Sequence, residues 1–229
     1  MDELLRYDHV DISYNGVQVV KDLSFVVSPG EILGIVGESG SGKSTIIKAA
    51  MGLLGSSGLV TRVDIWYKGK NLPDLSPAEL RRLNGPELAM IFQYAGSSFC
   101  PIRTVGAQLY ESMTEHEAIS REQFRARAGS LLEKLGFEDP GRILASYPFE
   151  LSGGMQQRIG IAAAMLLNPG VLFADEPTSD LDDENMNIVL KLLREEADNG
   201  AAVFIVTHDA EALEIADVTL TMNAGTLVR

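Results

Sequence analysis

The stretch that decides the fold runs Ile32-Leu33-Gly34-Ile35-Val36-Gly37-Glu38-Ser39-Gly40-Ser41-Gly42-Lys43-Ser44-Thr45. It opens with a short, continuous apolar run, which is typical of a strand buried on both faces in a parallel sheet. The residues that follow match G-x-x-x-x-G-K-[ST], and a helix is predicted to begin near Ser44. Because strand and helix flank the motif where it must lie, the pattern favours a phosphate-binding loop over a structural glycine turn.

The composition of this loop suits a nucleotide. Glycines let the chain turn back so that successive backbone N–H groups and a helix N-terminus point at phosphate oxygens. In such loops the lysine reaches the β- and γ-phosphates, and the hydroxyl after it binds magnesium. We therefore expect a nucleoside triphosphate and Mg²⁺, with the phosphates held by Gly37, Glu38, Ser39, Gly40, Ser41, Gly42, Lys43, Ser44 and Thr45.

Two adjacent carboxylates, Asp175 and Glu176, follow a second apolar run at residues 171–174. This is the strand end at which parallel sheets bind ligands. Adjacent residues of an extended chain point to opposite sides, so the two carboxylates can take different roles. We expect Asp175 to hold magnesium and Glu176 to orient and polarise the water that attacks the γ-phosphate.

A third motif, Leu151-Ser152-Gly153-Gly154-Met155-Gln156-Gln157-Arg158, is predicted to begin another helix, with Ser152 as its N-cap. From the residues alone it is a second anion site, built from a hydroxyl, glycine N–H groups and a helix N-terminus. One triphosphate does not need two such sites from one chain.

The remaining pattern predicts alternating strands and helices. Capping boxes begin at Ser76 and Ser120, and the stretch from about 104 to 167 is predicted to be helical throughout. The other expected elements are strands joined by tight turns near 10–16 and 23–30, a strand at 201–206, a helix at 183–199 and a hairpin at 223–225. Apolar strands alternating with helices imply a mostly parallel sheet with an inserted helical lobe.

Composition narrows the function classes. Hydrophobic residues make up 45% and charged residues 22%, as in ordinary globular proteins. The formal net charge of −13 repels phosphate backbones, which disfavours a nucleic-acid binder. The single cysteine, Cys100, excludes an intrachain disulfide and is expected to be a small, partly buried residue. The longest apolar run, 159–167, is too short to span a membrane, and the acidic N-terminus lacks an export signal.

Taken together, these motifs make the chain resemble the ATP-binding subunit of an ABC transporter over essentially its whole length. The resemblance implies an α/β P-loop NTPase core with a mostly parallel sheet, an N-terminal antiparallel β-subdomain and an inserted helical subdomain. It implies one domain, 1–229, with its core at about 1–93 and 168–229 and the helical subdomain at about 94–167. It also implies that two subunits face head to tail, with ATP between the phosphate loop of one and Ser152 and Gly154 of the other.

The same resemblance implies roles for further residues. Tyr14 matches the aromatic that stacks on adenine, the alternative being a strand aromatic that packs locally. Gln93 matches the residue that reaches magnesium and the attacking water. His208 is implied to contact the γ-phosphate and Glu176. Asp182 is implied to lie across the dimer seam, the alternative being simple helix capping. The binding set also includes Ser152, Gly153, Gly154 and Gln156.

Within the family, the segments around Gln93, Cys100 and Tyr147 and the methionine in the Ser152 motif are most similar to the peptide and nickel importer branch. Tyr94-Ala95, Cys100 and Asp180 stand where that branch usually has Asp-Pro, asparagine and alanine. The first two departures lie where a membrane partner is expected to dock. The chain ends at Arg229, before the extension usual in peptide importers, so peptides and metal chelates both stay open.

The expected partners are a second ATP-binding subunit, two transmembrane permease subunits and an extracytoplasmic solute-binding protein. The chain is then expected on the cytoplasmic face of the membrane. An exporter subunit is the alternative, because the ATP-driven part alone carries no direction of transport. A soluble ABC ATPase acting on nucleic acid is a further alternative, disfavoured by the charge and by the absence of tandem motif sets.

Overall fold

The computed structural model describes residues 3–62 and 64–228 and contains two sheets. The antiparallel sheet has the order β2-β1-β5-β6, with β4 also pairing with β1. Its strands are β1 (Leu5–Tyr14), β2 (Val17–Val27), β4 (Gly58–Arg62), β5 (Ile65–Tyr67) and β6 (Lys70–Asn71). The hairpin between β1 and β2 turns at Asn15 and Gly16, both with positive φ, as the tight-turn pattern predicts.

The second sheet has the order β11-β10-β3-β9-β8-β7 and is parallel except for its last hairpin. Its strands are β3 (Ile32–Val36), β7 (Leu88–Ile91), β8 (Val171–Asp175), β9 (Ala202–Thr207), β10 (Val218–Asn223) and β11 (Thr226–Val228). The predicted buried strands are confirmed as β3, β8 and β9, and the final hairpin as β10–β11.

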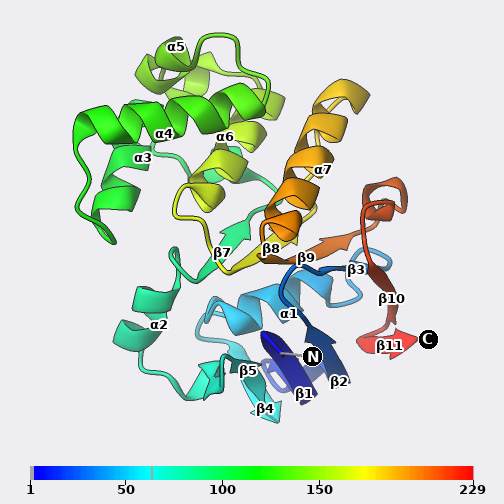
Figure 1. Ribbon diagram of the computed structural model, residues 1–229. Helices are drawn as coiled ribbons and strands as arrows, with labels where there is room; N and C mark the ends of the chain where they lie inside the picture. Colours follow the sequence, from blue (N-terminus) through cyan, green and yellow to red (C-terminus); the bar gives the residue numbers. More distant parts are fainter. Residues whose placement is uncertain (1–2, 63, 229) are drawn as a thin grey trace.

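Helices cover both faces of this sheet (Figure 1). They are α1 (Lys43–Ala50), α2 (Pro77–Leu83), α3 (Val105–Thr114), α4 (Arg121–Lys134), α5 (Pro140–Ala145), α6 (Gly153–Met165) and α7 (Asp183–Asp198). Helix α1 lies between the two sheets, whereas α3 to α6 gather beyond the opposite face, next to α7. We call α3 to α6 the helical lobe. No helix among the described residues has the length and apolarity that crossing a bilayer requires.

Local sequence sets where these helices begin. Capping boxes at Ser76 and Ser120 open α2 and α4, since in each a serine hydroxyl accepts from the N3 backbone while the N3 side chain accepts from the cap. Ser152 caps α6, with its Oγ accepting from the Met155 N–H at 3.3 Å. The helical expectation for 104–167 is confirmed, with Gly136 (φ 79°) following α4 at the predicted stop.

Two strand segments escaped the sequence analysis. Strands β4 to β6, which complete the antiparallel sheet, are short and lie in a segment whose apolar and polar residues alternate over only a few positions. All residues of strand β7 are buried, but the strand has only 4 residues. A run that short does not separate a strand from a buried helical turn by periodicity alone. β7 matters for function because it leads directly to Gln93.

The parallel sheet separates two hydrophobic clusters. Along β9, Val203 and Ile205 face the helical lobe and α7, whereas Phe204 and Val206 face α1 and the antiparallel sheet. Phe204 is completely buried and contacts the rings of Tyr7, Phe25 and Phe173 at centroid distances of 6.4, 5.2 and 6.0 Å. One aromatic side chain of the central strand therefore fastens the antiparallel sheet to the parallel one.

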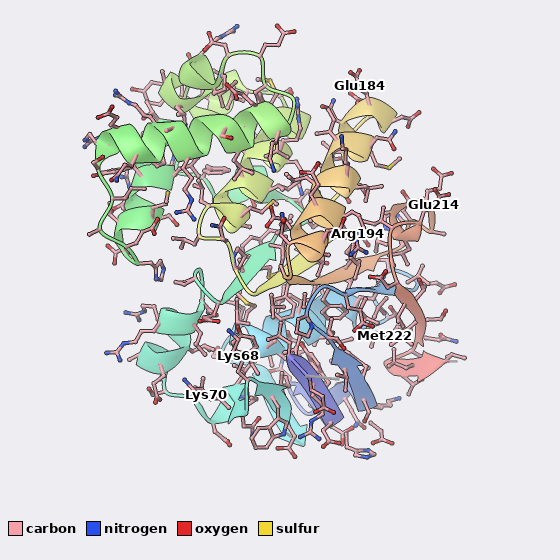
Figure 2. The ribbon with its side chains drawn as sticks, viewed as in Figure 1. Lys68, Lys70, Glu184, Arg194, Glu214 and Met222 are labelled. Carbon is pink, nitrogen blue, oxygen red and sulfur yellow. The ribbon has the colours of Figure 1, made fainter. Side chains whose placement is uncertain are left out.

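Polar contacts fix α7 and β10 against the sheet. The Arg194 guanidinium donates to Asp217 at 2.9 Å, and the same carboxylate accepts from the Ile32 N–H at 2.8 Å at the start of β3. Figure 2 shows Arg194 on α7 on the side of β10. These contacts hold the pKa of Asp217 below its usual value, chiefly through the hydrogen bond from Ile32.

We expect Phe204→Ala to destabilise the fold by about 3–5 kcal/mol, because the truncation leaves a cavity between the two sheets. Val17→Ala, at a site on β2 that is 66% exposed, is the control and should change the free energy of unfolding by about 0.5 kcal/mol or less. Denaturant unfolding followed by circular dichroism measures both. Equal effects of the two variants would contradict this view of the core.

Candidate nucleotide site

A cavity of about 740 Å³ opens at the carboxyl ends of the parallel strands. It brings the predicted loop together with three distant predicted residues. The lining comprises Val19, Val36, Gly37, Glu38, Ser39, Gly40, Gly42, Lys43, Ser44, Thr45, Gln93, Glu176, His208 and Thr221. The volume lies within the range of small-molecule sites.

The loop between β3 and α1 has the backbone that its glycines require. Gly40 and Gly42 have φ of 82° and 105°, in the left-handed region that side chains disfavour. Gly37 is required for another reason, since a Cβ there would lie 2.3 Å from the Met222 carbonyl oxygen on β10. Figure 2 labels Met222 on that strand. β10 therefore supports the loop from behind, and only glycine fits at this contact.

Two polar groups of the loop are buried in a way that suits an anionic ligand. Lys43 is only 6% exposed, and its ammonium donates to the carbonyl oxygens of Gly37 and Glu38 at 2.6 and 3.0 Å. The Ser41 Oγ is buried without a hydrogen-bond partner among the described residues. Buried polar groups are normally satisfied, so this hydroxyl and the loop N–H groups fit phosphate oxygens.

Ser44 and Asp175 meet across the base of the cavity. The Ser44 hydroxyl donates to Asp175 Oδ1 at 2.7 Å, although the residues are far apart in sequence. Asp175 is 4% exposed, and burial raises its pKa above the usual value, partly offset by the bond from Ser44 and by Lys48. A hydroxyl and a buried carboxylate side by side are oxygen ligands that suit Mg²⁺, so the residues present fit this ion.

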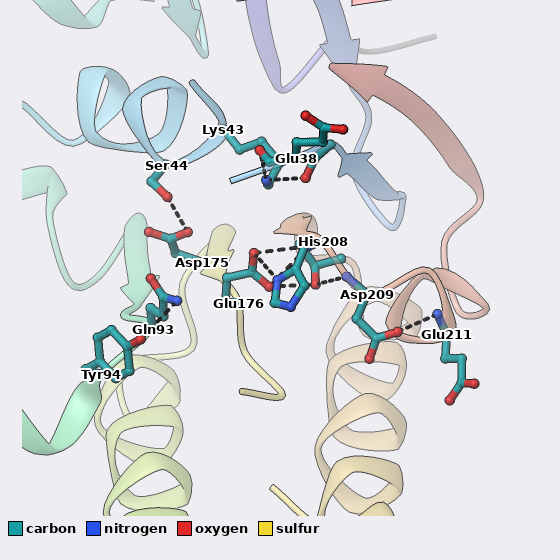
Figure 3. A network of polar contacts seen from close by, with 12 residues as sticks. Glu38, Lys43, Ser44, Gln93, Tyr94, Asp175, Glu176, His208, Asp209 and Glu211 are labelled. Carbon is teal, nitrogen blue, oxygen red and sulfur yellow. Dashed lines mark hydrogen bonds and ion pairs between the residues drawn. The ribbon is translucent and has the colours of Figure 1, made fainter. Parts of the chain in front are cut away.

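The Glu176 carboxylate is held by its own chain (Figure 3). It accepts from the Thr207 hydroxyl at 2.7 Å and from the His208 backbone N–H at 3.0 Å, and it contacts His208 Nδ1 at 2.9 Å. Glu176 has a positive φ of 50°, which turns the chain sharply after β8. Its carboxylate is therefore fixed at the cavity wall, next to an imidazole that is largely exposed.

The structure places other predicted residues around this centre. Gln93 lines the cavity, and its amide lies 3.5 Å from the Tyr94 hydroxyl. Tyr14 is half-buried at the end of β1, opposite Val17, and is not part of the lining. Adenine stacking on Tyr14 thus stays a prediction.

The Ser152 segment lies outside the cavity. Ser152, Gly153 and Gly154 begin α6, and none of them is part of the cavity lining. The Gln156 amide donates to the Pro148 and Leu151 carbonyl oxygens, so it is turned toward the backbone of its own lobe. Asp182 caps α7 by accepting from the Asn185 N–H at 2.9 Å, which is the helix-capping alternative weighed for this residue.

The comparison with known proteins agrees with this geometry. The sequence profile of the ABC transporter family matches residues 20–179. The chain belongs to the ABC transporter family. It is therefore an ABC cassette, which binds and hydrolyses ATP.

Individual relatives of this cassette are transport subunits. It is 39% identical to the dipeptide transport ATP-binding protein DppD of Bacillus subtilis, over 98% of this chain and 69% of that protein. It is 36% identical to the metal-staphylopine import system ATP-binding protein CntD of Staphylococcus aureus, over 98% of this chain and 84% of that protein. A solved cassette dimer in a post-hydrolysis state with ADP and Pi is 26% identical, with a TM-score of 0.87 over 99% of this chain and 97% of that chain.

Two residues of this cassette escaped the sequence analysis. Thr207 holds Glu176, and its signal was its place at the end of β9, directly before His208. Gln157 is 3% exposed and contacts the backbone on both sides of Gln93 and Tyr94. Nothing in the local pattern distinguishes it from Gln156, because its partners lie on a distant segment.

We expect Asp175→Asn to raise the melting temperature of the nucleotide-free cassette. The raised pKa of Asp175 means that its carboxyl binds a proton more tightly in the folded state than in the unfolded state. The free energy of unfolding therefore rises as the pH falls through that pKa, and it is lower at pH values where the carboxylate is ionised. The amide removes the buried charge and keeps the acceptor for Ser44. At this chain length 1 kcal/mol corresponds to roughly 2–4 °C.

The same variant should lose the extra stabilisation that ATP with Mg²⁺ gives over ATP with EDTA. Asp183→Asn, at an exposed acid in the first turn of α7, is the control and should keep that increment. Differential scanning fluorimetry measures both quantities. An Asp175→Asn protein that melts earlier and keeps the full Mg²⁺ increment would refute the assignment.

Proposed function

We propose that this chain is the nucleotide-binding subunit that drives an ABC importer from the cytoplasmic face of the cell membrane. In this proposal it pairs with a second ATP-binding subunit and docks peripherally on two transmembrane permease subunits, which receive solute from an extracytoplasmic binding protein. The observation that carries the proposal is a divided site. The phosphate loop and Glu176 line one cavity, whereas Ser152 caps a helix outside it. A second chain is needed to complete the contacts to ATP.

In the proposed closed pair, ATP lies between the phosphate loop of one subunit and Ser152, Gly153 and Gly154 of the other. The first turn of α6 carries no acidic residue, so its N-terminal N–H groups and the Ser152 hydroxyl suit an anion. This use explains why the chain carries a second anion site in addition to the cavity lined by its phosphate loop. Asp182, beside the seam, couples the two sites while it caps α7.

The proposed chemistry follows from the positions of the polar groups. Glu176, fixed by Thr207 and His208, orients the attacking water and accepts its proton. Lys43 exchanges its two carbonyl partners for β- and γ-phosphate oxygens, and Tyr14 stacks on adenine. Ser44, Asp175 and Gln93 hold Mg²⁺, which supplies positive charge for the phosphates. The division into a core at about 1–93 and 168–229 and a helical subdomain at about 94–167 belongs to the same proposal.

A groove of about 480 Å³ between the sheet and the helical lobe is the proposed docking site for the permease. Phe92, Ala95, Phe99 and Leu109 are among its lining residues. Phe92, in the lining, is 39% exposed, and Tyr94, two residues further along the chain, is 61% exposed. Exposed aromatic side chains beside an apolar groove suit a protein interface. Because the groove adjoins Gln93, docking can act directly on the nucleotide cavity.

Peptides and nickel or other metal-chelate complexes are the proposed solutes. The similarity to DppD supports the first and the similarity to CntD supports the second. Import is favoured over export because CntD is named for import. The net charge of −13 argues against a nucleic-acid partner.

Glu176→Gln should keep ATP affinity and lower steady-state ATP turnover by at least about 100-fold, since the amide cannot accept the proton. Glu214→Gln, at an exposed position after the short helix Glu211–Leu213, is the control and should turn over normally. Fluorescent nucleotide titration and phosphate release measure binding and turnover. Unimpaired hydrolysis by the Glu176→Gln protein would remove Glu176 from the catalytic role.

The docking proposal predicts that the tagged protein, purified from detergent-solubilised membranes, retains two spanning subunits and a second ATPase chain. Phe92→Asp should lower the amount of spanning subunits that co-purify at least tenfold, because it puts a charge into the apolar interface. ATP binding should persist. Val17→Asp, on the far antiparallel sheet, is the matched control. Recovery with ribosomes or DNA in place of spanning subunits would overturn the proposed function.

A further inference from the structure

The buried side chain of Gln157, on α6, binds the backbone on both sides of the pair Gln93-Tyr94. Its Nε2 donates to the Phe92 carbonyl oxygen at 3.0 Å, and its Oε1 accepts from the Ala95 N–H at 3.1 Å. The side chain is 3% exposed, so both hydrogen bonds are shielded from water. One amide thus fixes both ends of the two-residue segment that presents Gln93.

The segment after this pair is packed on α6 without space between them. A Cβ at Gly160 of α6 would lie 2.1 Å from the Ala95 Cβ, and a Cβ at Gly96 would lie 2.0 Å from the Gln156 Oε1. Residues 95–98, which form a short 3₁₀ turn, therefore move with α6.

The segment before the pair belongs to the sheet. β7 pairs with β8, where Ile91 lies opposite Ala174, the residue before Asp175. Gln93 therefore sits between a strand that is tied to the candidate magnesium ligand and a turn that is tied to the helical lobe. Among the described residues the one hydrogen bond of its own amide goes to the Tyr94 hydroxyl, at 3.5 Å. The position of Gln93 in the cavity thus depends on its backbone, which Gln157 holds.

We propose that Gln157 is the positioning residue for Gln93 and that its amide transmits movement of α6 to the nucleotide cavity. The inference rests on the proposed function, in which Gln93 reaches Mg²⁺ and the attacking water. α6 also carries Ser152 at its N-terminus. The helix that contacts the ATP of one site therefore sets, through Gln157, the glutamine of its own chain's site.

Two substitutions test this role. Gln157→Met keeps a long unbranched side chain and removes both hydrogen bonds. Gln157→Glu places a carboxylate beside the Phe92 carbonyl oxygen, where burial raises its pKa. Once protonated, that group donates to Phe92 and accepts from Ala95, as the glutamine does. Activity relative to wild type should therefore recover on acidification in the Glu variant alone.

We expect both variants to bind ATP within about twofold of wild type, which shows that they are folded. The turnover number of Gln157→Met should fall at least tenfold at pH 8 and at pH 6. The turnover number of Gln157→Glu should fall similarly at pH 8. At pH 6 it should be at least threefold higher than that of Gln157→Met, when each is expressed relative to wild type at the same pH. Near-normal turnover of the Met variant, or equal turnover of the two variants at both pH values, would overturn the inference.

Gln108→Glu is the matched control. The Gln108 amide also binds backbone in the helical lobe, accepting from the Cys100 N–H at 2.7 Å and donating to the Arg103 carbonyl oxygen at 3.0 Å, but it does not touch the Gln93 pair. Gln108 also lines the proposed docking groove, so the turnover of this variant is measured on the cassette without permease subunits, where it should stay within twofold of wild type at both pH values. A loss in this variant equal to that of Gln157→Glu would mean that disrupting any such amide-to-backbone contact in the lobe lowers turnover, and the inference would fail.

A double-mutant cycle separates this inference from the proposed function. If Gln157 acts through Gln93, the combined variant Gln93→Ala with Gln157→Met should turn over no more slowly than Gln93→Ala alone. If the two losses multiply, Gln93 keeps its proposed role and the positioning role of Gln157 fails. If Gln93→Ala alone retains normal turnover, the role proposed for Gln93 fails, and the inference fails with it.

Discussion

The parallel pairing of β3 with β9 and of β9 with β8 is the constraint on which the site depends. The register puts Val36 opposite Thr207 and Asp175 opposite Val206, so the carboxyl ends of three strands lie at one edge. The phosphate loop and His208 follow two of these ends directly, and the acidic pair begins at the last residue of β8. A slip of one residue in either pairing would turn the side chains of that strand to the other face and separate Ser44 from Asp175.

The charged groups at this edge are satisfied by backbone groups, hydroxyls and one imidazole. Lys43 is buried in a chain of net charge −13, yet two carbonyl oxygens satisfy its ammonium more closely than any carboxylate does. Asp175 relies on a hydroxyl, and Glu176 on a hydroxyl, an N–H group and the exposed imidazole of His208. Each group can therefore change partners when a phosphate or a cation arrives, without the loss of a buried ion pair, which would leave one charge uncompensated.

The parts of the site that depend on residues close together in the sequence could be predicted from the sequence. The glycine loop, the serine caps and the acidic pair each need particular residue types within a few positions, so their patterns predicted a strand, a turn or a helix start correctly. Longer-range features escaped. The role of Met222 behind Gly37 depends on the path of β10, and that of Gln157 on a contact with residues 92 and 95. β4 to β7 were missed because a few alternating or apolar residues fit more than one structure.

The contacts that join the sheets differ in strength from the contacts that position Gln93. Phe204 and Arg194 fasten the antiparallel sheet, α7 and β10 to the parallel sheet through aromatic and charged contacts that span sequence-distant elements. The residue that lines the cavity from the lobe side, Gln93, is fixed mainly by two hydrogen bonds from one amide to the backbone. Two such bonds contribute on the order of 1 kcal/mol each, far less than the burial of an aromatic core residue. If the helical lobe moves as the proposed function requires, we expect the geometry around Gln93 to change before the strand ends that hold Lys43, Asp175 and Glu176 are disturbed.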